Sequence, residues 1–111
     1  MERRRHQRFC ALLGAELDSG EQTPRLGITQ DISLSGVRLF TLSRVGVGRE
    51  IDLRIAVDTR SNATCHAQIV RERDISDTGL WRREISLQFD PFIPEALLIR
   101  IREVASRQNR L

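Results

Sequence analysis

Positive charge is concentrated at the start of this 111-residue chain, in the stretch ERRRHQRF at residues 2–9. Four arginines, Arg3, Arg4, Arg5 and Arg8, fall within six positions, before any hydrophobic pattern begins. A guanidinium is a planar fork of donors that can hold a phosphate through two parallel hydrogen bonds and can stack on flat rings. The segment therefore has the chemistry of an anion-binding arm, and a solvated tail is the alternative for a charge run of this kind.

A second polar stretch, DISLSG at residues 31–36, offers complementary groups. Asp31 and Ser33 are two residues apart, so on a strand their side chains would share one face. Gly36 would permit a backbone turn that a β-carbon obstructs. A carboxylate can accept hydrogen bonds from the N1–H and N2 amine edge of guanine, whereas arginine suits phosphate and the O6/N7 edge. Together the two stretches predict a site for a guanine nucleotide with accessible phosphates.

The elements that must position these groups are short strands. The clearest alternation is IDLRIAV at residues 51–57, whose apolar side chains would all face one side. The second predicted strand alternates only in part, and its pattern picks out Leu26, Ile28 and Ile32 as the inward side chains. The expected strands lie at residues 9–17, 25–32, 37–40, 51–57, 63–72 and 81–89.

The pattern changes after Pro91 and Pro94, where apolar residues recur at the helical period. The predicted helix carries a stripe made of Leu97, Leu98, Ile101, Val104 and Ala105. Regularly spaced short strands indicate a sandwich or a barrel, and closure into a barrel removes exposed sheet edges. We therefore expect a mainly β fold, a six-stranded antiparallel barrel with a C-terminal α-helix that caps an open end or forms an interface.

Composition and motifs argue against a membrane protein, a secreted protein, a metal-binding protein and an enzyme. No apolar run approaches the roughly 20 residues that a membrane span needs, and no apolar stretch follows the basic N-terminus as in a signal peptide. We expect one cytoplasmic domain without membrane insertion. Cys10 and Cys65 are too few and too far apart for a metal site, so both are expected to be core thiols. No nucleophile–base pair and no glycine-rich phosphate loop before a helix is present, which argues against an enzyme.

Taken in order, the two polar stretches resemble the signature of the PilZ domain, a bacterial receptor for cyclic di-GMP (c-di-GMP). That signature is RxxxR followed by [D/N]xSxxG. Arg4 and Arg8 match its first part, and Asp31, Ser33 and Gly36 match its second. The resemblance implies that the two arginines hold phosphate and a guanine edge. It implies further that the aspartate and serine bind the other face or edge of guanine from the barrel surface, and that the glycine shapes the loop.

The resemblance also implies a division of the chain and a mechanism. Residues 1–8 would be a flexible basic arm that carries RxxxR, residues 9–90 the PilZ barrel, and residues 91–111 the C-terminal helix. Ligand would order the arm on the barrel, and an unidentified downstream protein would read the change in trans. In relatives, an arginine at the position of Arg3 often accompanies two intercalated ligand molecules, so Arg3 joins the predicted site. No cofactor is expected besides the ligand.

Two departures from the signature bear on the site. DISDTG at residues 74–79 also fits DxSxxG, but it reads as a hairpin tip, and its Asp77 would repel a dianionic ligand. Residues 31–36 are therefore the predicted copy. EISLQF at residues 84–89 carries Ser86 where the family commonly has glycine, and we expect no effect of this change on the ligand.

Two other functions remain open from the sequence. One is a PilZ-like adaptor that does not bind ligand, although all five signature positions are present. The other is a small-barrel nucleic-acid binder. The chain has four phenylalanines, one tryptophan and no tyrosine, which is a poor supply of the aromatic platforms on which bases usually stack. Nucleic acid is therefore not the expected partner.

Overall fold

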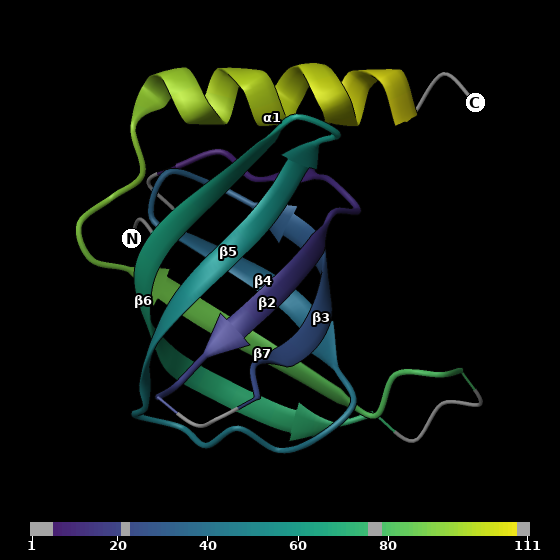
Figure 1. Cartoon of the computed structure of the whole chain (residues 1–111), viewed down its shortest axis with the longest axis vertical. Helices are drawn as coiled ribbons and strands as arrows, with labels where there is room; N and C mark the ends of the chain where they lie inside the picture. The colour runs from purple at the N-terminus through teal and green to yellow at the C-terminus, as the bar shows by residue number, and fades with distance from the viewer. Residues whose placement is uncertain (1–5, 21–22, 76–78, 109–111) are drawn as a thin grey trace, which may run out of the picture.

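The computed structural model describes residues 6–20, 23–75 and 79–108 of the chain (Figure 1). Within these ranges the chain forms seven strands and one helix. The strands are β1 (Phe9–Cys10), β2 (Gly14–Asp18), β3 (Arg25–Ile32), β4 (Gly36–Thr41), β5 (Glu50–Asp58), β6 (Ser61–Asp74) and β7 (Arg83–Phe89), and the helix is α1 (Glu95–Gln108).

Six of these strands close into an antiparallel barrel (Figure 1). Around the ring, β2 pairs with β5, β5 with β6, β6 with β7, β7 with β4, β4 with β3, and β3 again with β2. The short strand β1 pairs with the end of β3. The predicted fold class is therefore confirmed: a mainly β chain with a six-stranded antiparallel barrel and a C-terminal helix.

The barrel interior is filled by alternate residues of each strand. β5 alternates between buried and exposed along its whole length, as its sequence predicts, and Leu53 and Ile55 are fully enclosed. Full burial of one such side chain stabilises the fold by about 1.5–3 kcal/mol.

Helix α1 lies across one open end of the barrel (Figure 1). Ile101 and Ala105 are buried in the core, and the half-buried residues packed beside them are Leu97, Leu98 and Val104. The predicted stripe therefore faces the barrel and caps it. Among the described residues, no helix combines the length and apolar character needed to cross a membrane.

The prediction of one strand over residues 9–17 is wrong, because residues 11–13 interrupt it. At this break the side chain of Thr29 takes part in the pairing. Its hydroxyl donates to the carbonyl oxygen of Ala11 and accepts from the backbone N–H of Leu13 at 2.9 Å. A buried side chain thus satisfies backbone groups that a continuous ladder would have satisfied.

The prediction that Leu26 and Ile28 face inward is also wrong. Gly27 and Thr29 are buried instead, and Leu26 is 60% exposed. A β-carbon built on Gly27 would lie 2.7 Å from the carbonyl oxygen of Phe40, so the inner side of β3 has room only for a small residue there. Tight packing, rather than apolar character, sets the inward face of this strand.

The two cysteines have different environments. Cys65 is buried in the core as predicted, and burial raises the pKa of its thiol to about 11. Cys10 is exposed, so its assignment to the core is wrong. The reason is the pairing of β1 with the end of β3, where Cys10 lies opposite Asp31.

Candidate functional site

Asp31 is placed by an irregularity in β3. Thr29 faces the interior opposite Leu39, and the register then shifts, so that Asp31 pairs with Arg38 of β4. A bulge of this kind adds one residue and re-aims the side chain that follows it. Without the shift, strict alternation would turn Asp31 to the same side as Thr29. The bulge therefore sends a carboxylate to the outer face of the barrel.

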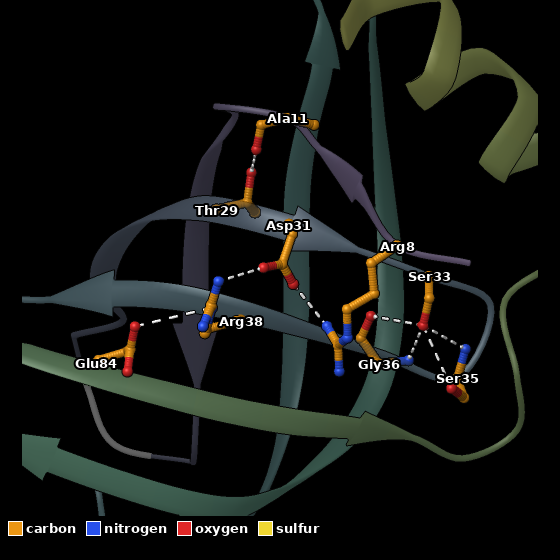
Figure 2. Close-up of polar contacts among 9 residues, drawn as sticks. All are labelled: Arg8, Ala11, Thr29, Asp31, Ser33, Ser35, Gly36, Arg38 and Glu84. Carbon is orange, nitrogen blue, oxygen red and sulfur yellow. Dashed lines mark hydrogen bonds and ion pairs between the residues drawn. The ribbon is translucent and has the colours of Figure 1, made fainter. Parts of the chain in front are cut away.

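The carboxylate of Asp31 is held between two arginines (Figure 2). Its Oδ1 lies 2.6 Å from Nη1 of Arg8, and its Oδ2 lies 2.6 Å from Nη2 of Arg38. The side chain of Asp31 is only 12% exposed, so water screens these contacts less than it would on an open surface. Each oxygen thus accepts from one arginine, and a carboxylate has further lone pairs that can accept from another donor.

Arg38 is also shared with a second acid. Nε of Arg38 lies 3.8 Å from Oε2 of Glu84 on β7 (Figure 2). The other oxygen of Glu84, Oε1, accepts a 2.6 Å hydrogen bond from Nε of Arg73. The acidic groups nearest to the site are thus already paired with arginines of the barrel.

Ser33 shapes the turn between β3 and β4. Its hydroxyl oxygen accepts hydrogen bonds from the backbone N–H groups of Ser35 and Gly36, both at 3.2 Å (Figure 2). The backbone N–H of Ser33 donates to the carbonyl of Gly36 at 2.8 Å. Ser33 is 1% exposed and follows the end of β3, so it does not share an outer face with Asp31 as the spacing predicts.

Gly36 is needed for a close approach between strands. A β-carbon at this position would lie 2.5 Å from the carbonyl oxygen of Leu87 on β7. Its φ is not positive, so the conformational freedom predicted from the sequence is not the reason for glycine here. The turn is also attached to the end of β7 and to the segment after it, since Phe89 N–H donates to the carbonyl of Ser35 and Ile93 N–H donates to the carbonyl of Leu34.

Beside Asp31 the outer face of the barrel is hollowed into a cavity of about 300 Å³. Its lining consists of Arg8, Cys10, Asp31, Arg38, Arg71 and Ser86. Three arginines and one aspartate give these side chains a net charge of +2. The cavity is therefore suited to an anion that also has groups for a carboxylate to recognise.

A larger cavity, of about 430 Å³, lies on another face of the barrel, where it is lined by residues of β2, β3, β5 and β6 together with Trp81. Its lining includes exposed Leu26, and its one arginine, Arg54, lies 3.5 Å from Glu16. This cavity offers apolar surface and a neutralised charge pair. The smaller cavity at Asp31 is the better candidate for a phosphate-bearing ligand.

The structure brings together part of the site predicted from the sequence. Arg8 and Asp31 meet directly, and Ser33 and Gly36 form the adjoining turn. Arg3 and Arg4 lie outside the described residues. The repeated DxSxxG at residues 74–79 lies partly outside them as well.

Sequence reasoning missed Arg38 and Cys10 as parts of the cavity wall, and it favoured a solvated strand face over this surface for Arg71. Ser86 was singled out but expected to be irrelevant to the ligand, and it lines the cavity too. Alternation along 37–40 places Arg38 on the outer face, which was a usable signal. The position of Arg71 depends on a register shift in β6 that the sequence pattern does not indicate.

Comparison with known proteins identifies the family and the fold of the chain. The PilZ domain family model matches residues 2–105. No curated protein matches the sequence closely enough to count as a relative. Among solved structures, the PilZ domain of YcgR from Escherichia coli with c-di-GMP is similar, with a TM-score of 0.78, 19% identity, and 98% of this chain and 95% of that chain covered.

Two longer structures are similar as well. YcgR from E. coli in complex with c-di-GMP has a TM-score of 0.75 and 19% identity over 99% of this chain and 49% of its own. The inhibitor of motility MotI/DgrA from Bacillus subtilis has a TM-score of 0.73 and 16% identity over 99% of this chain and 53% of its own. This chain thus spans about half the length of these two proteins. With the family model matched over nearly the whole sequence, the chain belongs to the PilZ domain family.

Proposed function

We propose that this chain is a receptor for c-di-GMP that binds the ligand in the cavity beside Asp31. The observation that carries the proposal is the Asp31 carboxylate held by Arg8 in a cavity whose described lining has a net charge of +2. c-di-GMP has two phosphodiesters, hence two negative charges, and two guanines with donor edges. Membership of the PilZ family and the two similar structures solved with c-di-GMP support this choice of ligand.

In this proposal each signature residue has a distinct task. Arg4 and Arg8 bind phosphate and the O6/N7 edge of a guanine, and Asp31 accepts from the N1–H and N2 amine of a guanine. Ser33 and Gly36 act through the shape of the turn, because the serine hydroxyl is already engaged by backbone N–H groups. Arg3 contributes when two intercalated ligand molecules bind together.

Binding begins with an exchange of partners at Asp31. Oδ1 of Asp31 contacts Arg8, and Oδ2 contacts Arg38. A guanine edge replaces one of these contacts, and the released guanidinium becomes available for phosphate or for stacking on the base.

The arm is also connected to the helix, which gives the signal a route to a partner protein. Phe9, next to Arg8, packs against the guanidinium of Arg102 on α1, with 4.5 Å from Cζ to the ring centroid. His6 contacts Phe92, in the segment before α1, with ring centroids 5.0 Å apart. A ligand that repositions Arg8 therefore alters contacts to α1, and a downstream protein that binds this surface reads the difference.

The test is a calorimetric titration of c-di-GMP into the wild type, Arg8→Ala and Asp31→Ala, with GTP as the control ligand. We expect the wild type to bind c-di-GMP with micromolar or tighter affinity and both variants to lose at least about tenfold, the loss of one charge-assisted hydrogen bond. Arg60→Ala, at the β5–β6 turn outside the cavity, removes the same charge as Arg8→Ala and should bind normally.

The fitted stoichiometry distinguishes one ligand molecule from an intercalated pair. Circular dichroism confirms that each variant is folded. Absence of binding by the folded wild type would refute the receptor proposal, and equal binding of GTP would refute the assigned ligand.

A further inference from the structure

The cavity is crossed by a single row of side chains on neighbouring strands. Each residue in the row pairs directly with the next across the barrel ladder. In order, the row consists of Cys10 on β1, Asp31 on β3, Arg38 on β4, Ser86 on β7 and Arg71 on β6. All five line the cavity, so the row forms its floor from one end to the other.

Two register shifts put charged residues into this row. In β3 the shift lies between Thr29 and Asp31, and in β6 it lies between Ile69 and Arg71. Thr29 and Ile69 are both fully buried, and strict alternation would turn Asp31 and Arg71 inward after them. Both bulges therefore deliver a charged side chain to the same outer surface, as expected of bulges beside binding sites.

Arg71 differs from the other arginines of the cavity. Within the described part of the chain its guanidinium has no hydrogen-bond or ion-pair partner, whereas Arg8 and Arg38 both engage Asp31. Glu84, the acid two positions from Ser86 on β7, is engaged by Arg73 and Arg38. Arg71 is thus a cation on the cavity wall with its donors unused.

Arg71 lies at the other end of the row from the signature residue Asp31. Asp31 on β3 and Arg71 on β6 stand three strands apart around the barrel, with Arg38 and Ser86 between them in the row. Ser86 lies between Arg38 and Arg71, and its side chain is much shorter than theirs, so it leaves more space in this part of the cavity. A ligand that reaches both ends must be long and must present an anionic group at the end far from Asp31.

We propose that Arg71 binds the second phosphate of c-di-GMP, at the opposite end of the cavity from Arg8 and Asp31, and that Ser86 leaves the space through which the ligand spans the two ends. The inference rests on the proposed function, since it assigns a further residue to the same site. It also makes Ser86 part of the ligand floor, contrary to the expectation from the sequence.

The experiment compares c-di-GMP affinity, by calorimetry, among the wild type, Arg71→Ala, Arg71→Lys and Arg60→Ala. Arg60→Ala changes the net charge equally but lies outside the cavity, so it separates a local contact from a general charge effect. We expect Arg71→Ala to bind about tenfold or more weakly than Arg60→Ala. Arg71→Lys should recover part of the loss, because lysine keeps the charge and lacks the planar fork.

An affinity of Arg71→Ala equal to that of Arg60→Ala would overturn the role of Arg71. If Arg8→Ala still loses binding in that case, the receptor proposal stands and only the inference about Arg71 fails. Absence of binding by the wild type would instead refute the receptor proposal, and the role of Arg71 with it. Arg71 is exposed, and its side chain makes no hydrogen bond or ion pair with the residues that the structure describes, so thermal unfolding of the variants without ligand should be unchanged.

Discussion

Gly36 shows how a single residue can be required by the distance between two strands. In Gly36→Ala the added β-carbon would lie 2.5 Å from the carbonyl oxygen of Leu87, so β4 and β7 must separate locally. We expect the free energy of unfolding, measured by urea denaturation, to fall by about 1–3 kcal/mol, as in other overpacked interiors. Affinity for c-di-GMP should fall as well, because the turn of Ser33 moves with β4.

The matched control is Gly14→Ala in β2. A β-carbon there meets nothing within 4 Å, and its φ is not positive. Its free energy of unfolding should stay within about 0.5 kcal/mol of the wild type. Equal losses in the two variants would show that the close approach at Leu87 is not what requires glycine at position 36.

At the scale of elements, the join between β1 and β2 depends on one buried hydroxyl. In Thr29→Val the shape of the side chain is kept, but the carbonyl of Ala11 and the N–H of Leu13 lose their partner. Both residues are buried, so these groups gain no water in exchange. We expect a loss of about 2 kcal/mol or more in the free energy of unfolding, measured by urea denaturation.

Thr64→Val serves as the control, because Thr64 lies exposed on β6 and its hydroxyl has no hydrogen bond among the described residues. Its free energy of unfolding should be unchanged within error. A Thr29→Val protein as stable as Thr64→Val would show that the backbone groups at residues 11–13 find other partners.

The elements differ in how well the sequence predicts them. β5 follows strict alternation, and its position and inward face were predicted correctly because its apolar residues are large and regularly spaced. β3 was placed correctly but with its faces exchanged. Its inward positions hold Gly27 and Thr29, where the close backbone of Phe40 and the bonds to residues 11–13 outweigh apolar character.

The sequence also predicts only some of the residues of the candidate site. A signature of residue types and spacing predicted Arg8 and Asp31, which meet at 2.6 Å. Arg71 faces the same cavity because of a register shift in β6, whereas Ser86 lies on the outer face of β7 by simple alternation. A bulge adds one residue in one strand relative to its partner, so it depends on pairing that a single sequence does not display.

At the scale of the whole molecule, the two ends of the barrel are closed by different devices. Helix α1 covers one end, and the segment between β4 and β5 crosses the other (Figure 1). That segment inserts buried Val45 into the core, and Glu72 of β6 holds it by accepting from the N–H groups of Val45 and Gly46 at 2.9 and 2.8 Å. Arg83 donates to the same carboxylate at 3.1 Å.

This closure makes the stability of the fold dependent on pH. Burial alone would raise the pKa of Glu72, but the bonds from Val45, Gly46 and Arg83 favour the charged form more strongly and lower it below the ordinary value of 4.5. A carboxyl with a lowered folded pKa stabilises the fold above its unfolded pKa, and this contribution is lost as the pH falls through the folded pKa.

Glu72→Gln should therefore unfold more easily than the wild type at pH 7, by about 1–3 kcal/mol. The difference should shrink below about pH 4.5 in urea denaturation series at pH 7, 5 and 3, while exposed Glu103→Gln should follow the wild type throughout. A difference that stays constant down to pH 3 would mean that the charge of Glu72 does not hold this end of the barrel closed.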